Sequence, residues 1–544
     1  MDCDDQNPLA HPGMTEICGD GADNDCDGDT DEDCQTGRVY YVDQDSLGGP
    51  CDDNGPGTID APWCHVAKAN ATLTAGDTAY IRAGIYEETI QPQNSGSSDS
   101  RRVVYQAFNR ETVTFTRSVY CVRLQSRSYV TLRDLRFVDC QRNLYLDACH
   151  HVEVIGCSFD NPSGPVTWAG SRIYNGSSFN RISGCTFSRY GNESGSEGAW
   201  DDNACVLDIG NDNIVDPSDH NLIEDSAFFH GGHHILGVYG NYNVVRRNTF
   251  HNEEWYPCHR PETGNLCGNR NIILNTSFPD ANIRNVIEDN IIAFSGVPPD
   301  NINSTGLSLR TQYNIVRRNV FYLNDSAGLG LSADGGNGNN PSHNHVYHNV
   351  FFKNGYPLVD DWNPSKYGMI LARWVDDAEH NSVVGVAIKN NIFSQNQLAG
   401  IYFYYVDPAQ QFVSGNRIEP EDPLFADVSG NPGPFDFGVF DFRLAPGSPC
   451  IDGGEFLTVT TGAGQTSVTL VVEDAGYFSD GNGVVPGDLI QLEGQKAVAR
   501  IASIDYDTNT LTLETPLTWE PGTGVAQPYA GARPDPGAFE HRDD

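Results

Sequence analysis

The sequence lacks any long apolar run. Hydrophobic residues make up 38% of the 544 residues, and the mean hydropathy is -0.43. No stretch approaches the roughly 18 consecutive apolar residues that a membrane-spanning helix needs. A secretory leader is also missing, because Met1 is followed at once by Asp-Cys-Asp-Asp, and we interpret Met1 as an initiator added to a trimmed chain. The sequence therefore predicts no membrane span, and it carries no indication of oligomeric state.

Methionine is scarce, with three residues, whereas there are 15 cysteines. This usage predicts an oxidising setting, so we expect a secreted or cell-surface, extracellular protein of bacterial type. Two close pairs, Cys51 with Cys64 and Cys258 with Cys267, predict short disulfide-closed loops. Because 15 is odd, at least one thiol is free or pairs elsewhere.

Positive charge is missing from residues 1–36, which hold twelve Asp and Glu but no Lys or Arg. The formal net charge of the whole chain is -40, which argues against a nucleic acid partner. Lysine is also missing from residues 101–320, yet 20 arginines there stand against 23 acidic residues, a difference of about three charges. This arginine-rich region is compatible with an anionic substrate.

The acidic head places carboxylates at alternate positions around a glycine. The candidate metal ligands are Asp23, Asp25, Asp27, Asp29 and Asp31. Calcium prefers six to eight oxygen ligands, which this spacing supplies from a tight turn, but Cys34 stands where an EF-hand has its bidentate Glu. The block resembles the Cys- and Asp-rich metal-binding repeat of bacterial secreted proteins, which is similar to thrombospondin type 3 repeats. The resemblance implies structural Ca2+ in a stalk-like linker.

Short apolar segments recur irregularly between about residues 120 and 415, as in "EVIGCSF", "NVVRRNTF", "NIVRRNVF" and "NHVYHNVF". Each is followed by a variable loop and a second apolar run such as "HILGV" or "GLSLR". The units are β-branched, are punctuated by Asn and Gly, and lack helical periodicity. Self-similarity at this spacing indicates a solenoid, so the sequence predicts an all-β, right-handed parallel β-helix.

One small polar position recurs in register. Its members are Cys157, Cys185, Ser226, Asn248, Asn290, Asn319, Asn349 and Asn391. We expect these residues to stack at one corner, where asparagine side chains satisfy backbone groups at buried turns and the two cysteines are buried thiols. Arg246-Arg247 and Arg317-Arg318 alternate with Glu-Asp at 224–225 and 288–289. That alternation predicts a charge ladder on an outer face, so we exclude these arginines from the site.

Both ends of the repeat region resemble a known group. "RVYYVDQDSLGG" and the residues up to about 90 look like the opening of secreted parallel β-helix proteins of the pectate-lyase superfamily. "FRLAPGSPCIDGG" and "PDPGAFE" look like their usual C-terminal close. The resemblance implies the fold and a polysaccharide substrate, but no specific reaction.

Residues 455–530 alternate apolar and polar side chains between turns, which predicts a small antiparallel β-barrel or sandwich. We expect this module to cap the open edge of the solenoid, with sugar binding as the alternative. The predicted domains are the acidic repeat 1–36, the β-helix 37–454, the inserted module 455–530 and the closing segment 531–544.

Histidine, tryptophan and charged residues gather in a few long loops between adjacent rungs, where solenoids form binding grooves. His230 and His251 are expected at the start of outer loops, and His233 and His234 just before the strand "ILGV". The candidate catalytic residues are His233, His234, His251, Arg310, Asp201, Asp202, Glu253 and Glu254. The candidate substrate-binding residues are Trp200, Trp255, His230, Arg270, Lys353, Arg373 and Trp374.

Two cleavage chemistries fit these residue types. In β-elimination a cation neutralises a uronate carboxylate while a base removes the C5 proton, roles open to Arg310, Arg270, His233 and Lys353. In hydrolysis two carboxylates flank the glycosidic bond, and Asp201-Asp202 or Glu253-Glu254 supply them. We favour a polysaccharide lyase, keep a glycoside hydrolase as the alternative, and expect Ca2+ as a further cofactor if acidic loops bridge a uronate.

Two other interpretations remain open. His230, His233, His234 and His251 have the ligand type for a zinc site, although their spacing is not that of a helical zinc motif. A non-catalytic polysaccharide-binding or adhesion protein would use the same aromatic groove without groups for proton transfer.

Overall fold

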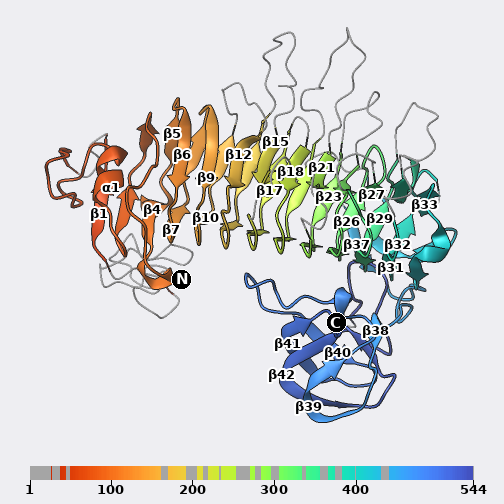
Figure 1. Cartoon of the computed structure of the whole chain (residues 1–544). Coiled ribbons are helices and arrows are strands. Elements are labelled where there is room, and N and C mark those ends of the chain that lie inside the picture. Colours follow the sequence, from red (N-terminus) through yellow and green to blue (C-terminus); the bar gives the residue numbers. More distant parts are fainter. Residues whose placement is uncertain are drawn as a thin grey trace, which may run out of the picture. The chain divides into compact units, whose positions relative to one another are not determined.

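The computed structural model describes residues 26, 37–44, 49–160, 169–190, 205–211, 218–231, 234–252, 270–275, 283–295, 305–333, 339–355, 366–373, 383–398, 400–430 and 440–542. The chain divides into two compact units, Met1–Leu207 and Asp208–Asp544. Figure 1 labels the strands of each unit and colours them along the sequence. The division falls inside strand β15 (Cys205–Ile209), within the segment expected to form one β-helix.

The turns of the first unit contribute strands to three parallel sheets, and the third sheet begins at the turn that contains β4 and β5. The first sheet has the order β1 (Val39–Val42), β2 (Thr78–Ile81), β4 (Val103–Ala107), β7 (Val130–Arg133), β10 (Glu153–Ile155), β13 (Arg181–Ser183). The second sheet has β3 (Gly84–Tyr86), β5 (Val113–Thr116), β8 (Arg136–Val138), β11 (Ser158–Asp160), β14 (Thr186–Ser188). The third sheet has β6 (Tyr120–Gln125), β9 (Arg142–Asp147), β12 (Ala169–Tyr174).

The second unit repeats this arrangement. Its first sheet has β16 (Leu222–Glu224), β19 (Val244–Arg246), β22 (Val286–Glu288), β25 (Ile315–Arg317), β28 (His345–Tyr347), β31 (Ala387–Lys389), β34 (Phe412–Ser414). Its second sheet has β17 (Ala227–Phe229), β20 (Thr249–His251), β23 (Ile291–Ala293), β26 (Val320–Tyr322), β29 (Val350–Phe352), β32 (Ile392–Ser394), β35 (Arg417–Ile418). Its third sheet has β18 (His234–Val238), β21 (Arg270–Leu274), β24 (Leu307–Leu309), β27 (Leu329–Ala333), β30 (Met369–Arg373), β33 (Ile401–Tyr404).

Strands that follow one another along the chain thus belong to different sheets, and each pairs in parallel with the strand one turn later, as Val245 does with Ile287. Parallel strands joined by crossovers follow a right-handed path in nearly all proteins. The predicted all-β, right-handed parallel β-helix is therefore confirmed.

Outside the three parallel sheets, the described residues of the β-helix include a few short elements. They are helix α1 (Val66–Thr72), 3-10 turns at Asp99–Arg101, Phe108–Arg110 and Pro408–Gln410, and the antiparallel pair β36 (Phe425–Asp427) and β37 (Asp441–Leu444). A further 3-10 turn, Ala475–Tyr477, belongs to the C-terminal module. The predicted Cys51–Cys64 disulfide is present, and Cys121–Cys140 is a second. None of the helices among the described residues has the length and apolar character needed to cross a membrane.

A two-residue turn joins each first-sheet strand of the second unit to the next second-sheet strand. Its first residue is Gly415 in the last of these turns and Asp225, Arg247, Asp289, Arg318, His348 or Asn390 in the others, and each of these six non-glycine residues has a positive φ of 52–56°. Non-glycine residues rarely adopt this left-handed conformation, so the surroundings must hold it in place. The second residue of the turn provides that support.

This second residue is the predicted ladder position. The side-chain amide of Asn290 donates to Asn319 Oδ1 at 3.0 Å, and that of Asn319 donates to Asn349 Oδ1 at 3.1 Å. The backbone N–H of Asn290 also donates to Asn319 Oδ1 at 3.0 Å, so each side chain serves both the turn and the ladder. In the first unit the Cys157 and Cys185 thiols donate to backbone carbonyls at this position, and burial raises the pKa of Cys157. The predicted ladder is confirmed.

Two further asparagine ladders occupy the other corners of the second unit. One contains Asn221, Asn243, Asn285, Asn314 and Asn344, and the other contains Asn324, Asn354 and Asn396. Between the corners, aromatic rings stack inside the coil, such as Phe321, Phe351 and Phe393 with centroids 4.8 and 4.7 Å apart. Phe228 and Phe250 stack in the same way at 5.0 Å, as their register predicts.

Replacing one inner ladder residue tests this account. Asn319→Ala leaves the backbone N–H of Asn290 and the carbonyl of Ile287 buried without these bonds. Each unsatisfied group costs on the order of 1–3 kcal/mol. We expect the free energy of unfolding to fall by about 3 kcal/mol in urea titrations followed by circular dichroism. Asn54→Ala, at an exposed asparagine, is the control, and equal effects of both substitutions would contradict the ladder's role.

The C-terminal module is a six-stranded antiparallel sheet, as predicted. Its order is β38 (Thr458–Val459), β43 (Gly524–Ala526), β40 (Leu489–Leu492), β41 (Val498–Asp505), β42 (Thr510–Trp519), β39 (Gly464–Val471). Side chains on its interior pack in one buried cluster with Leu222, Val244, Val286 and Ile315 from the first sheet of the second unit.

The module therefore covers the outer side of the first sheet. The hydroxyl of Tyr347 donates to the Tyr477 carbonyl at 2.5 Å, and His345 Nε2 lies 2.9 Å from Asp474 Oδ2. On the last strand of that sheet, β34, Phe412 and Val413 remain exposed at 67% and 42%. We expected the module to cap the open edge of the solenoid. Instead, its buried contacts are with the outer side of the first sheet, along the side of the solenoid.

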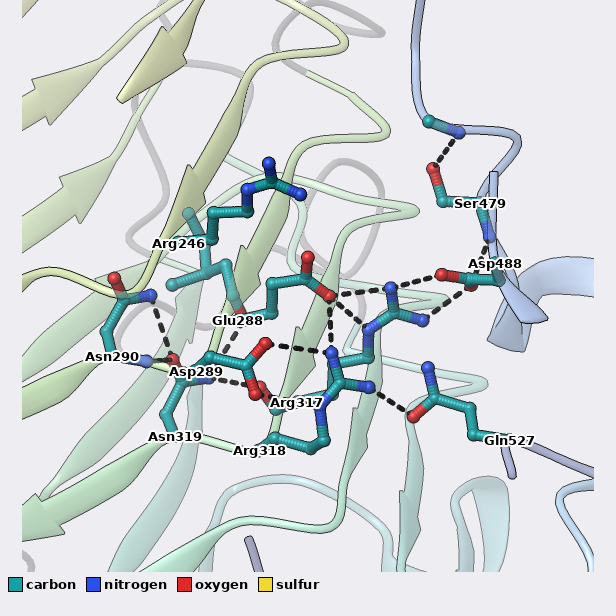
Figure 2. A network of polar contacts seen from close by, with 12 residues as sticks. Arg246, Glu288, Asp289, Asn290, Arg317, Arg318, Asn319, Ser479, Asp488 and Gln527 are labelled. Atoms are coloured by element: carbon teal, nitrogen blue, oxygen red, sulfur yellow. Dashed lines mark hydrogen bonds and ion pairs between the residues drawn. The ribbon is translucent and has the colours of Figure 1, made fainter. Parts of the chain in front are cut away.

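The predicted charge ladder lies at this contact, where it is more deeply buried than an outer face implies (Figure 2). Arg317 is only 3% exposed and reaches Glu288 and Asp488 at 2.6 Å each. Arg318 pairs with Asp289 at 2.8 Å and also donates to Gln527 of the module. Burial alone would disfavour the charged form of Glu288, but the positive charges of Arg317 and Arg318 hold its pKa at about 2.

This network predicts acid sensitivity. Because the folded pKa of Glu288 is depressed from 4.5 to about 2, its stabilisation is present above pH 4.5 and is lost as the pH falls towards 2. The difference corresponds to roughly 3 kcal/mol. We expect Glu288→Gln to be less stable than the unsubstituted protein at pH 7 but to lose less stability between pH 5 and about 2.5, measured by thermal unfolding. Asp507→Asn, on the exposed surface of the module, should leave the pH profile unchanged.

Candidate functional site

Within the β-helix of the second unit, the longest connections lead into or out of its third sheet. Residues 252–269 join β20 to β21, 294–306 join β23 to β24, 353–368 join β29 to β30, and 374–386 join β30 to β31. First-sheet and second-sheet strands are joined by only two residues in each turn, as between β19 and β20. Because binding residues concentrate where long loops border a rigid scaffold, the outer side of the third sheet is the candidate site.

A buried histidine–aspartate pair lies on this side. His234 begins β18, Asp208 lies on β15, and His234 Nε2 is 2.8 Å from Asp208 Oδ1. The two side chains are 3% and 6% exposed. The hydroxyl of Tyr239 lies 3.4 Å from the same histidine nitrogen. The pair is thus enclosed, with a phenol at its edge.

The backbone leaves room for this pair at Gly237. A Cβ at that position would lie 2.4 Å from Asp208 Oδ1 and 2.8 Å from His234 Nε2, so any larger residue would displace one of the two. A carboxylate bound to Nε2–H fixes the tautomer in which Nδ1 carries the lone pair. The arrangement therefore orients the imidazole and can stabilise the imidazolium that forms when the ring accepts a proton.

On the following rungs, one isoleucine and then two small residues continue the column of Gly237. Gly237 pairs in register with Ile273, which pairs with Ser308, which pairs with Gly330. Arg310 follows Ser308 on the chain, is partly exposed, and its Nε lies 3.4 Å from Ser308 Oγ. Strands β18 and β24 are two rungs apart, which corresponds to about 10 Å. A cationic group therefore lies within the span of a short oligosaccharide from His234.

Aromatic residues continue this side at the last rungs. Tyr367 stacks on Tyr402 with centroids 4.6 Å apart, and Tyr402 and Tyr404 are partly exposed beside Ala372 and Ile370. Exposed rings of this kind suit sugar rings, because one face of a pyranose is apolar.

Asp325 is a further titratable group near the third sheet. It lies in the connection between β26 and β27, and burial raises its pKa to about 7. A carboxyl group with such a pKa is protonated in part at neutral pH and can act as a general acid.

Several predicted site residues lie on the second sheet instead. His251 ends β20, is 2% exposed, and stacks on Phe229 at 4.9 Å, whereas His230 lies edge-on to His251 at 5.8 Å. Lys353 lies over the Phe352 ring at 5.0 Å and over Phe440 at 5.4 Å. The expectation that His234 precedes its strand and that His251 starts a loop was wrong, because both belong to strands. The histidines around position 230 are therefore divided between two sheets: His234 belongs to the third sheet and His251 to the second.

Other predicted residues are placed only in part. Arg373 ends β30 and pairs in register with Ala333. Arg270 begins β21 opposite His234, but its side chain is outside the described part. The other predicted site and cysteine residues lie outside the part of the chain that the structure describes. They are His233, Asp201, Asp202, Glu253, Glu254, Trp200, Trp255, Trp374, Cys258, Cys267, Asp23, Asp25, Asp27, Asp29 and Asp31.

The sequence analysis missed Asp208, Tyr239, Ser308 and Asp325. Asp208 could have been identified from the sequence, because "CVLDIG" contains a single acidic residue in an otherwise apolar segment. That segment forms a strand that is buried throughout. Tyr402 and Tyr404 also stand in a conspicuous run, "IYFYY". Ser308 and Asp325 carry no sequence pattern that separates them from structural residues.

Comparison with known proteins gives one match to the sequence and several to the fold. Residues 2–32 match a family model, Cu-binding MopE, described as "Putative metal-binding motif". No curated protein matches the chain.

Three solved structures illustrate the similarity of fold. A pectate lyase, Pel9A, is 14% identical with a TM-score of 0.45, covering 94% of this chain and 98% of its own. A rhamnogalacturonan lyase is 14% identical with a TM-score of 0.44, covering 76% and 96%. A family GH136 lacto-N-biosidase from Eubacterium ramulus is 13% identical with a TM-score of 0.43, covering 70% and 67%.

Proposed function

We propose that this protein is a carbohydrate-active enzyme that cleaves a polysaccharide along the outer side of the third sheet in the second unit. The reaction we favour is β-elimination at a uronic acid residue. The buried His234–Asp208 pair carries this proposal, because an oriented imidazole on a sheet bordered by long loops is equipped for proton transfer.

The proposed roles follow from the geometry. His234 Nδ1 removes the C5 proton, and Asp208 stabilises the resulting imidazolium. Arg310 pairs with a uronate carboxylate further along the bound chain, whereas Arg270, in register with His234 one rung away, is the proposed cation that neutralises the reacting carboxylate and makes the C5 proton more acidic. As the C4–O4 bond breaks, its electron pair leaves with the oxygen and a C4–C5 double bond forms. The Tyr239 hydroxyl is the proposed donor of a proton to that oxygen, since it lies beside the histidine. His233 remains a proposed contributor to substrate binding, whereas Lys353 lies over aromatic rings at the second sheet and is not assigned to this site.

A glycoside hydrolase is the second candidate. Asp325 supports it, because burial keeps the pKa of this carboxyl group near 7, as a general acid requires. Asp201, Asp202, Glu253 and Glu254 remain the proposed sources of the second carboxylate. A binding or adhesion protein without turnover is the remaining alternative.

The first test follows both products on a panel of acidic and neutral polysaccharides. A lyase releases reducing ends together with ultraviolet absorbance from the new double bond, whereas a hydrolase releases reducing ends alone. We expect both signals, and we expect His234→Ala and Asp208→Asn each to lower kcat by about 100-fold or more with little change in KM. His343→Ala, at a corner histidine stacked on Tyr313, is the matched control.

Three outcomes would contradict this proposal. Reducing ends without absorbance would establish the hydrolase, and full activity of His234→Ala would remove this pair from the chemistry. Binding without cleavage of any polymer would favour an adhesion protein.

We also propose that the protein acts outside the cell. The Cys51–Cys64 and Cys121–Cys140 disulfides support this, because structural disulfides persist mainly in oxidising compartments.

For the acidic head we propose structural Ca2+. The alternating carboxylates Asp23, Asp25, Asp27, Asp29 and Asp31 offer hard oxygen ligands, which suit calcium better than copper. Calorimetric titration of the full chain should show Ca2+ binding that is at least about tenfold weaker in Asp25→Asn/Asp27→Asn. Asp507→Asn is the control. Binding of Cu2+ in preference to Ca2+ would overturn the choice of metal. Because the proposed role of this Ca2+ is structural, the Asp25→Asn/Asp27→Asn variant should keep its cleavage activity.

A further inference from the structure

The third sheet of the first unit presents a regular array of tyrosine and arginine on its outer side. The array consists of Tyr120, Arg123, Arg142, Tyr145, Arg172 and Tyr174, and we name it the Tyr–Arg platform. In register, Arg123 pairs with Tyr145, which pairs with Arg172, so the two residue types alternate from rung to rung. Leu144 and Leu146 alternate with Tyr145 on β9 and are fully buried, which places Tyr145 on the outer side.

The rings and guanidinium groups of the platform are in mutual contact. The Tyr120 and Tyr145 ring centroids are 5.1 Å apart, and those of Tyr145 and Tyr174 are 4.9 Å apart. The guanidinium groups of Arg123, Arg142 and Arg172 lie 4.9, 5.4 and 5.8 Å from a tyrosine ring. All six residues are partly exposed. Packing between neighbouring side chains thus holds the platform in shape before any ligand arrives.

The arginines of the platform have no ion pairs among the residues that the structure describes. Arg123 Nε and Arg172 Nε are buried atoms that lack a hydrogen-bond partner there. The nearest acid along β9 is Asp147, whose oxygens accept hydrogen bonds from Gln125 at 3.0 Å and Asn175 at 2.9 Å. By contrast, Arg317 and Arg318 each contact two acidic side chains. The platform thus gathers three cations that form no ion pair with any described residue, although the chain has a net charge of -40.

A polar cavity adjoins the platform in the same unit. Its volume is about 610 Å³, and Ser118, Gln125, Arg127, Glu88, Gln91 and Asn70 are among its lining residues. Gln125 ends β6 and also binds Asp147, so the cavity begins at the rung on which the platform starts. This volume is within the range of small-ligand sites.

We propose that the Tyr–Arg platform is a binding site for an anionic polysaccharide, separate from the candidate catalytic residues. Pyranose rings stack on Tyr120, Tyr145 and Tyr174 while carboxylate or sulfate groups pair with the guanidinium groups between them. The cavity receives a sugar unit at the end of the bound segment. The choice of a polysaccharide rests on the proposed function, whereas the negative charge of the ligand rests on the unpaired arginines. Single-stranded nucleic acid also stacks and carries charge, but repulsion from the net charge of the chain disfavours it.

The test is a direct measurement of binding by the full chain. Polygalacturonate, dextran sulfate, neutral galactan and oligo-dT are titrated by calorimetry, both with the unsubstituted protein and with His234→Ala. We expect binding of an anionic polysaccharide that weakens with added salt, and no binding of galactan or oligo-dT. Polygalacturonate and dextran sulfate separate carboxylate from sulfate recognition.

Variants then locate the binding site. Arg123→Gln/Arg172→Gln should weaken binding by at least about tenfold, and Tyr145→Ala by a similar factor, whereas Tyr145→Phe should bind nearly normally because it keeps the ring. The matched control is Arg136→Gln, an exposed arginine on the second sheet of the same unit, which should bind as the unsubstituted protein does. Thermal unfolding of each variant checks that the fold persists.

The outcomes separate this inference from the proposed reaction. Binding that depends on the platform, without cleavage, would support the platform and contradict the enzyme. Cleavage and binding unaffected by Arg123→Gln/Arg172→Gln would overturn the platform and leave the enzyme intact. If Arg136→Gln weakened binding as much as Arg123→Gln/Arg172→Gln does, the effect would be one of general charge, and the platform would be overturned. Binding of oligo-dT more tightly than the polysaccharides would also overturn it.

Discussion

The structure depends on the hydrogen bond that passes from one asparagine side chain to the next at the corners of the coil. In the turns from β19 to β32 a non-glycine residue adopts a left-handed conformation, and the asparagine after it caps the bend. Without that cap the turn would bury unpaired backbone groups, which is costly in a solenoid whose corners are closed to water. Because the bend has the same form in each turn, strands stack in register, and residues one turn apart lie in columns.

The columns explain how one fold carries several kinds of surface. Inside, they become stacks of phenylalanine. On the outer side of the first sheet, the column of alternating Glu-Asp and Arg-Arg pairs is buried under the C-terminal module. On the outer side of the third sheet, in each unit separately, the columns hold groups that are suited to ligands: tyrosine and arginine in the first unit, and a histidine–aspartate pair in the second. Insertions fall in the connections that lead into or out of the third sheet, because first-sheet and second-sheet strands are joined by only two residues in each turn.

The difference between the two arginine arrays shows how charge decides their roles. Arg317 is surrounded by Glu288 and Asp488 and lies beneath the module, so its charge is fully used in holding two parts of the second unit together. Arg123 and Arg172 have aromatic neighbours and no carboxylate partner among the described residues. A guanidinium group in the second setting retains its capacity for a bidentate contact with an anion. The same residue type thus serves assembly in one unit and, in our proposal, recognition in the other.

The sequence by itself determined the elements that repeat. The Asn positions, the Glu-Asp and Arg-Arg alternation, the inward phenylalanines and the small C-terminal β module follow from local pattern, because each rung imposes the same geometry on the same kind of residue. Tertiary structure decided what patterns cannot encode. His230, His234 and His251 are close in sequence, but the corner between them sends His234 to the third sheet and His251 to the second. Asp208 meets His234 across 26 residues, and Asp488 meets Arg317 across 171, because coiling and docking bring distant segments together. Those contacts depend on loop lengths and on which face is covered, neither of which leaves a periodic trace in the chain.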